Sequence, residues 1–210
     1  MLKKFKEILL NNYKWLICFI CLTGFIFITI NVFTNKIIKI DHIVYNFVST
    51  YLICDNLTPV IKIITFLGSA PCIIILMIIL FFIIRNKKQN ILLGANLFII
   101  TIINQTLKYL LKRPRPNIFR IVEESGYSFP SGHSMVSMAF YGYLIYLVYK
   151  NIKNKYLKRF LIIILSIIII LIGISRIYLG VHYTTDVLGG FLLSISYLVL
   201  FIHITKSIEK

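Results

Sequence analysis

The chain has 210 residues, of which 59% are hydrophobic and only 14% are charged, and its formal net charge is +16. An average soluble domain carries about a quarter charged residues, so this composition excludes an ordinary soluble protein and predicts one integral-membrane domain over residues 1–210. Nucleic-acid binding is not expected from the positive charge. Most basic residues form short clusters between apolar runs, as in the loops of membrane proteins.

Apolar segments, taken in chain order, predict six membrane-spanning helices. A helix needs about 20 apolar residues to cross the hydrocarbon core. The candidates are residues 15–33, 61–84, 91–109, 134–149, 160–177 and 187–205. The first is expected to be a span, because it is longer than the apolar core of a signal peptide. Since backbone groups in lipid must pair internally, the predicted fold is all-α, a polytopic membrane helix bundle.

Residues 40–52 have a different, amphipathic pattern. Apolar residues such as Ile40, Ile43 and Phe47 recur at intervals of three and four, which is helical spacing. The opposite face carries polar residues that include Asp41 and His42. We expect an interfacial helix lying on the membrane surface, which serves either as a lid or lipid-entry wall, or simply as a connector.

The distribution of basic residues predicts an orientation. Most of the 23 Lys and Arg residues fall on the side of the predicted bundle that holds both termini. The positive-inside rule therefore places the termini in the cytoplasm, in a multi-pass protein of the cell membrane. Three polar clusters then share the extracytoplasmic face. Residues 108–116 follow the third span, residues 130–133 precede the fourth, and residues 175–186 join the fifth to the sixth.

The first and third clusters supply the cations Lys108, Arg115 and Arg176. Arginine binds phosphate oxygens through a planar fork of donors, and three cations stabilise a phosphoryl group during transfer. The alternative is that they are ordinary positive flanks of spans. That alternative is weakest for Arg176, since it lies at the outer end of its span, where the positive-inside rule disfavours a cation.

The second cluster begins the predicted fourth span. Pro130 and a capping serine, such as Ser131, suit a helix start. Free N–H groups at a helix N-terminus attract anions, and Gly132 lets a phosphate approach the backbone closely. His133 then stands beside the bound anion.

His182 and Asp186 are four residues apart, which places them on one face of a helix. A carboxylate that accepts a hydrogen bond from one ring nitrogen fixes the tautomer and leaves the other nitrogen as a nucleophile. The alternative is a structural ion pair at a helix end.

Together these clusters resemble the signature of the type-2 phosphatidic acid phosphatases, also called lipid phosphate phosphatases, and the chain looks most like their bacterial members. The family pattern is K-x6-RP, then PSGH, then SR-x5-H-x3-D. It is matched by Lys108, Arg115 and Pro116, by residues 130–133, and by Ser175, Arg176, His182 and Asp186. The resemblance covers about residues 60–205.

The resemblance implies that His182 attacks phosphorus and becomes a phosphohistidine, while Asp186 orients it. His133 is expected to protonate the leaving oxygen and then to activate water. The phosphoryl oxygens are expected to be held by Lys108, Arg115, Ser131, Gly132 and Arg176. No metal or cofactor is expected in such a phosphatase.

The expected substrate is a lipid phosphate in the bilayer: undecaprenyl diphosphate, phosphatidylglycerophosphate or phosphatidate. Two alternatives stay open. One is a phosphotransferase that passes the phosphoryl group to an acceptor other than water, and the other is a non-enzymatic membrane protein that binds anionic lipid.

Overall fold

The computed structural model describes residues 2–35, 38–117, 119–206 and 208, with side chains from residue 12 onwards apart from that of residue 35. Its elements are α1 (Leu2–Asn35), α2 (Lys39–Phe47), the π-helical η1 (Val48–Leu52), α3 (Thr58–Phe66), α4 (Ala70–Ile83), α5 (Lys87–Leu111), α6 (Gly132–Asn151), α7 (Lys155–Tyr178) and α8 (Thr184–Thr205). No strand occurs within these ranges, so the predicted all-α class is confirmed.

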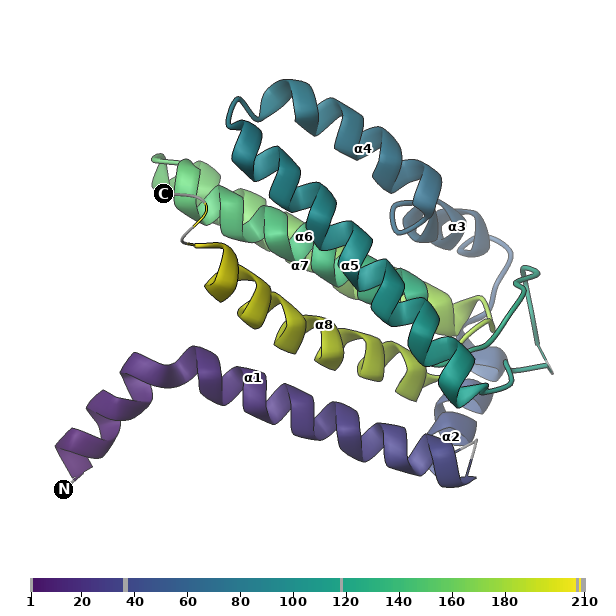
Figure 1. The fold of residues 1–210 in the computed structure, drawn as a ribbon. Coiled ribbons are helices and arrows are strands. Elements are labelled where there is room, and N and C mark those ends of the chain that lie inside the picture. The colour runs from purple at the N-terminus through teal and green to yellow at the C-terminus, as the bar shows by residue number, and fades with distance from the viewer. Residues whose placement is uncertain (1, 36–37, 118, 207, 209–210) are drawn as a thin grey trace.

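The long helices lie side by side in an elongated bundle (Figure 1). Helix α6 is its centre, because it packs against α5, α7 and α8, while α1 runs along α8. Large apolar side chains such as Phe27, Phe82 and Ile91 cover much of the outside. A soluble monomer rarely exposes so much contiguous apolar surface. In a bilayer these side chains contact lipid, which removes the free-energy cost of exposing them to water.

Within the described residues, four helical segments are long and apolar enough to cross a membrane: Asn12–Thr34 of α1, and helices α5, α7 and α8. Helices α3 and α4 pass that test only as a pair, bent by 50°, which makes up to five spans. The predicted span 61–84 is therefore not one straight helix. The chain breaks after Phe66 and restarts where Ser69 accepts a hydrogen bond from the Cys72 amide, 3.5 Å away.

The predicted fourth span, residues 134–149, lies within α6, which is not among these spans. Its small and polar side chains point inward, since Ser134, Ser137 and Ala139 are fully buried. Neighbouring helices cover this helix, so the face it presents to the protein need not be apolar.

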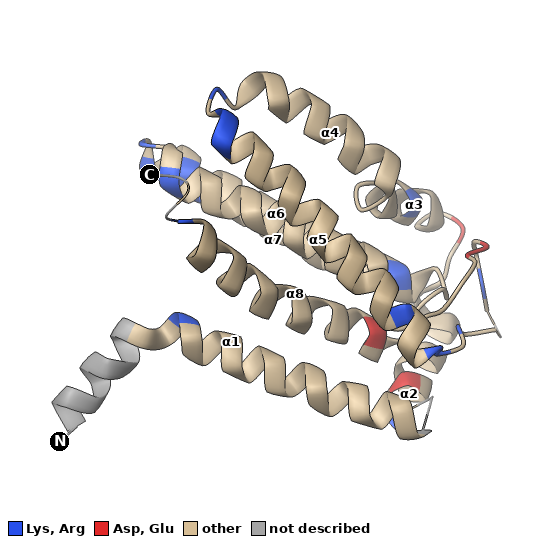
Figure 2. Cartoon of the chain, viewed as in Figure 1, with Lys and Arg blue, Asp and Glu red and all other residues tan. Residues whose placement is uncertain are grey.

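Charge is divided between the two ends of the bundle (Figure 2). One end carries Lys and Arg at the α4–α5 and α6–α7 connections. The Asp and Glu residues whose side chains the structure describes lie at the other end, near α2, before α3, in the segment 112–131 and at the start of α8. The lysine side chains at the N-terminus and those of Lys36 and Lys210, which contribute to the predicted charge bias, lie outside the described residues.

The amphipathic segment 40–52 forms α2 and η1, and part of its polar face is buried in the protein. Asp41 and Tyr45 are buried against the protein, whereas Ile43, Phe47 and Tyr51 are exposed. The Tyr45 hydroxyl donates to the Phe119 carbonyl, 2.8 Å away. One face of the segment, with Asp41, Tyr45 and Val48, thus packs on the protein, and its exposed face carries both apolar and polar side chains.

Candidate active site

The three polar clusters meet at one end of the bundle. Lys108 is in the last turn of α5, Ser131 caps α6, and Arg176 is in the last turn of α7. The segment 112–131 ties these helix ends together. The Ser131 amide donates to the Asp186 carbonyl at 3.1 Å, and the Ile121 amide to the Leu179 carbonyl at 3.1 Å.

His182 lies in the turn between α7 and α8 and is 2% exposed. Its Nδ1 is 3.3 Å from Oδ2 of Asp186, and its Nε2 is 3.2 Å from Nη1 of Arg115. A guanidinium only donates, so Nδ1 carries the hydrogen and Nε2 presents a lone pair. Burial lowers the pKa of His182 to about 4, although Asp186 raises it. The imidazole is therefore neutral at pH 7.

Asp186 is fully buried in the first turn of α8 and is held by several donors. Oδ2 accepts from the Ser128 hydroxyl at 2.5 Å and from the Tyr183 amide at 2.8 Å. Oδ1 accepts from Nη1 of Arg113 at 2.5 Å. The carboxylate thus has one orientation, with Oδ2 facing His182.

Arg113 and Asp41 extend this cluster into α2. Nη2 of Arg113 lies 2.5 Å from Oδ2 of Asp41, and both side chains are fully buried. Asp41 also accepts from the Thr185 amide at 2.9 Å and the Thr185 hydroxyl at 2.8 Å. Sequence reasoning missed Ser128, Arg113 and Asp41 as site residues. The one available signal was an acid in an amphipathic segment beside a membrane, because such an acid needs a partner.

Lys108 and Arg115 are held by carbonyl oxygens of the segment 112–131. Lys108 Nζ donates to the Tyr127 carbonyl at 2.9 Å. Arg115 donates from Nε to the Gly126 carbonyl at 3.1 Å and from Nη2 to the Ser125 carbonyl at 2.9 Å. Both cations therefore have fixed positions, and Arg115 lies beside Nε2 of His182.

Arg176 contributes the third cation, together with an unused donor. Nη1 donates to the Thr65 hydroxyl at 2.8 Å and Nη2 to Oε1 of Glu124 at 2.5 Å. Nε is buried and has no hydrogen-bond partner among the described residues. An unsatisfied buried donor is costly, so this atom is suited to receive an oxygen ligand.

Glu124 lies between two arginines, since its Oε2 is also 4.0 Å from Nη2 of Arg115. Burial raises the pKa of Glu124, but the charge and hydrogen bond of Arg176 outweigh it and hold the pKa below its ordinary value. The structure therefore has an ionised carboxylate where the two arginines converge. Sequence reasoning did not identify this residue.

The start of α6 forms the remaining wall. Ser131 is buried, and its hydroxyl accepts from the Ser134 amide at 3.4 Å and the Ser134 hydroxyl at 2.9 Å. Gly132 packs closely on α5, since a Cβ there would lie 3.1 Å from Oδ1 of Asn104. His133 is partly exposed and makes no hydrogen bond to another described side chain or carbonyl. Its imidazole is thus available for proton transfer.

Comparison with known proteins agrees with this geometry. The family model of the PAP2 superfamily matches residues 89–209, which is more than half of the chain. The chain belongs to the PAP2 superfamily. The family predicted from the sequence motifs is therefore confirmed.

Named relatives of this PAP2 protein include several phosphatases. Phosphatidylglycerophosphatase B of Bacillus subtilis (strain 168) is 45% identical over 96 residues, covering 45% of this chain and 47% of that protein. An undecaprenyl-diphosphatase of Sulfolobus acidocaldarius is 30% identical over 134 residues, covering 60% of this chain and 61% of that protein. The chain thus spans less than two thirds of the length of these relatives.

The fold is also similar to a solved structure over most of its length. The crystal structure of a transmembrane PAP2-type phosphatidylglycerolphosphate phosphatase from Bacillus subtilis superposes with a TM-score of 0.83 at 30% identity. The match covers 91% of this chain and 96% of that one. Together with the apolar helices, this identifies the PAP2 chain as a multi-pass membrane protein.

Proposed function

We propose that this PAP2 protein is a membrane lipid phosphatase that hydrolyses a phosphate monoester or diphosphate at the bilayer surface. One observation carries the proposal. The lone pair of a buried, neutral His182 points at Arg115, in a site where Lys108 and Arg176 add two more cations. A surface that only binds anionic lipid needs the cations but not an oriented nucleophile.

The first half of the reaction makes a phosphohistidine. Nε2 of His182 forms a bond to phosphorus as the bond from phosphorus to the leaving oxygen breaks. His133 donates a proton to that oxygen. Burial and then the charge of Arg176 lower the pKa of His133 in the free protein, and the negative substrate counteracts this by favouring the protonated form before the transfer. Asp186 stabilises the positive charge that develops on the His182 ring, as carboxylates do in related triads.

The second half releases phosphate. His133, now neutral, accepts a proton from water as the water oxygen attacks phosphorus. The bond between phosphorus and Nε2 breaks, and His182 returns to its neutral form. Microscopic reversibility supports this exchange of roles, since the same group gives and then takes the proton.

The phosphoryl oxygens have donors on three sides. The unpartnered Nε of Arg176 gains an acceptor, and the first free N–H groups of α6, at Gly132 and His133, point along a favourable helix dipole. Lys108 and Arg115 neutralise the remaining charge. Since Glu124 lies between the arginines, the substrate has to displace its carboxylate.

We propose six spans, with both termini in the cytoplasm and the site on the extracytoplasmic face. The clustering of Lys and Arg at the far end of the bundle supports this orientation (Figure 2). The exposed apolar side chains of α2, such as Ile43 and Phe47, support an interfacial position for that helix. The test uses a protein without its native cysteines. A cysteine at Glu123 should react with an impermeant reagent outside intact cells and one at Asn154 should not, and the reverse pattern contradicts the orientation.

The substrate is proposed to be phosphatidylglycerophosphate, undecaprenyl diphosphate or phosphatidate. Relatives named for the first two support these choices. Purified protein should be assayed for phosphate release from all three, with His182→Asn as the matched variant. Release that survives in His182→Asn contradicts the proposal. Transfer to an added alcohol in preference to water would instead favour a phosphotransferase, and binding without turnover would favour a lipid-binding protein.

A further inference from the structure

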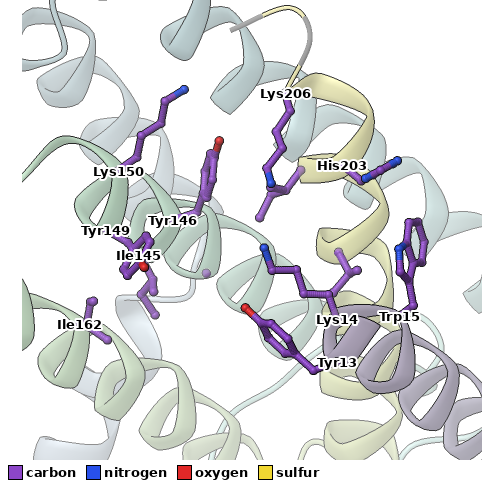
Figure 3. Close-up of a pocket in the computed structure, with 13 residues that line it drawn as sticks. Tyr13, Lys14, Trp15, Ile145, Tyr146, Tyr149, Lys150, Ile162, His203 and Lys206 are labelled. Carbon is purple, nitrogen blue, oxygen red and sulfur yellow. The ribbon is translucent and has the colours of Figure 1, made fainter. Parts of the chain in front are cut away.

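A groove of about 770 Å³ opens at the end of the bundle opposite the active site (Figure 3). It lies between α1, α6, α7 and α8. Its walls are mainly apolar and include Gly142, Ile145, Ile162, Val199 and Ile202. A volume of this size is typical of sites that bind small molecules, and an apolar lining suits a hydrocarbon chain.

Basic side chains surround one end of the groove. In Figure 3 the ammonium groups of Lys14 and Lys206 point towards the same part of the hollow, while Lys150 lies at its edge. None of the lining residues is acidic, and the Asp and Glu residues whose side chains the structure describes lie at the far end of the molecule (Figure 2). Two like charges that share a hollow repel each other, so an anion between them is favoured.

Aromatic residues mark the depth of the groove in the membrane. Trp15 lies edge-on to His203 with their ring centroids 4.9 Å apart, and Tyr146 and Tyr149 line the opposite wall. Trp and Tyr are enriched where headgroups meet the hydrocarbon core. The groove therefore combines an apolar channel with a cationic mouth at the height of the lipid headgroups.

We propose that this groove binds one anionic phospholipid, with an acyl chain along its walls and the phosphate between Lys14 and Lys206. The proposed orientation places the site in the cytoplasmic leaflet, which attracts basic residues through its anionic lipids. A second copy of the chain is a poorer occupant. Self-association through this face would bring more lysines together without a described acid to neutralise them.

The test compares two lipids with identical acyl chains, phosphatidylglycerol and zwitterionic phosphatidylcholine, by native mass spectrometry of protein purified in neutral detergent. Wild type should retain phosphatidylglycerol preferentially. The double variant Lys14→Gln/Lys206→Gln should bind it about 30-fold more weakly, from about fivefold per lysine. The matched control is Lys87→Gln/Lys88→Gln, which removes the same charge at the same end of the bundle but outside the groove.

A second variant tests the apolar part. Ile162→Trp fills the channel and should weaken the binding of both lipids. A lipid with a photoactivatable acyl chain should label residues 142–162 or 199–206 in wild type only. Phosphate release in detergent should be unchanged in all variants. Equal retention of the two lipids, equal loss in both double variants, or cross-links between chains in place of lipid adducts would overturn the proposal.

A second inference rests on the proposed function and on a different observation, the buried ion pairs behind Asp186. Arg113 lies between two carboxylates, 2.5 Å from Asp41 and 2.5 Å from Asp186, and all three side chains are fully buried. Its guanidinium also stacks over the Tyr183 ring, 4.4 Å from the centroid. We infer that Arg113 is a positioning residue that holds Oδ1 of Asp186, so that Oδ2 stays directed at His182.

The geometry of arginine explains why this role needs that side chain. One planar fork reaches both carboxylates at once, whereas a lysine ammonium is a point charge on a flexible stem. Asp41 in turn is fixed by Thr185, the residue next to Asp186. Helix α2 is thereby connected to the catalytic turn.

The variant Arg113→Lys keeps the charge and loses the bridge. We expect kcat to fall about 10- to 100-fold, with KM nearly unchanged. A loss of this size is seen when groups that orient the ligating side chains of metal sites are removed. Asp41→Asn, which is isosteric, should show a smaller fall in kcat. It provides the alternative test of the positioning role if Arg113→Lys does not fold. The control is Arg120→Lys, in the same segment but exposed.

Formation of acid-labile phosphoenzyme distinguishes a failure of the proposed function from a failure of the positioning role of Arg113. Wild type that forms no phosphohistidine contradicts the proposed function itself. Wild type that forms it, with Arg113→Lys and Asp41→Asn forming it equally fast, overturns only the positioning role. A change confined to KM in folded variants would also overturn it.

Discussion

Nη1 of Arg115 lies 3.2 Å from Nε2 of His182, so a cation covers the nitrogen that is proposed to attack phosphorus. The same nitrogen of Arg115 also donates to the Val181 carbonyl at 3.0 Å. A phosphoryl group that reaches His182 replaces this N–H···N contact to a neutral ring with an N–H···O contact in which both partners are ionised, which is the stronger interaction. Substrate binding and exposure of the nucleophile are therefore one event.

Asp186→Asn is expected to reduce kcat by about 10³- to 10⁴-fold, as when the carboxylate that fixes a catalytic histidine tautomer is replaced. KM should change little, because Asp186 contacts His182 and not the phosphoryl oxygens. Asp55→Asn is the control, since Asp55 is an exposed acid at the same end of the bundle. Steady-state rates on one lipid phosphate check this, and a change in KM alone would contradict the role of Asp186.

The pH dependence of kcat/KM should have an acid limb near pH 4, because burial lowers the pKa of His182 to about 4 and only the neutral ring attacks. The sign for folding follows from the ordinary pKa of 6.5. Between pH 6.5 and pH 4, His182 binds a proton in the unfolded chain but stays neutral in the folded chain. The free energy of unfolding therefore decreases as pH falls from about 6.5 to about 4. An acid limb near pH 6.5 would contradict the lowered pKa of His182.

Thermal unfolding in detergent provides a second check of the same pKa. Wild type should lose more thermal stability than His182→Asn between pH 6.5 and pH 4.5, since the variant lacks the titrating group. Equal losses in the two proteins would assign the pH dependence to other residues.

Glu124→Gln should strengthen inhibition by inorganic phosphate several-fold, because the ionised Glu124 carboxylate pairs with Arg176 where the phosphoryl group is proposed to bind. The neutral amide competes less well for a guanidinium. Glu123→Gln is the matched control, since Glu123 is adjacent and exposed. Weaker inhibition in Glu124→Gln would mean that Glu124 organises Arg176 for binding and does not compete with the ligand.

The sequence predicts the parts of this site that depend on local pattern. Apolar runs place the helices, and each motif lies at the end of a long helix, so Lys108, Ser131 and Arg176 come together once the bundle forms. The family follows from the spacing of a few residues within those motifs. These features are local in the chain and need no knowledge of packing.

The remaining contacts depend on tertiary structure and leave little trace in the sequence. Arg113 pairs with Asp41, 72 residues away, and Ser128 reaches Asp186 from a loop with no periodicity. The break between α3 and α4 depends on a single serine cap at Ser69. Hydropathy alone also cannot separate α6, whose polar face is covered by its neighbours, from a helix that faces lipid.

Gly180→Ala should disrupt the turn that carries His182. Gly180 has φ +71°, and a Cβ there would lie 1.7 Å from the Phe119 carbonyl oxygen. Gly126→Ala is the control, because Gly126 has φ +73° but open space around it. Gly126→Ala thus reports the backbone strain alone, which costs about 1 kcal/mol. We expect a much lower thermal midpoint and activity for Gly180→Ala than for Gly126→Ala, and similar values would contradict the close contact.

The two histidines should respond differently to the leaving group. A lipid alkoxide needs a proton as it departs, whereas p-nitrophenolate is stable without one, and general acid catalysis is worth about 10²- to 10⁴-fold. If His133 supplies that proton, His133→Ala should be much slower than wild type on a lipid phosphate and only slightly slower in the first step with p-nitrophenyl phosphate. His182→Ala lacks the nucleophile and should be inactive with both substrates.

Single-turnover rates and acid-labile phosphoenzyme distinguish these roles. His133→Ala should accumulate phosphohistidine with p-nitrophenyl phosphate, because the second step still needs His133 to activate water, and His182→Ala should accumulate none. The proposed division of labour is wrong if His182→Ala becomes phosphorylated. It is also wrong if His133→Ala is folded, equally slow with both leaving groups and free of phosphoenzyme, because His133 would then be required before any bond to phosphorus forms.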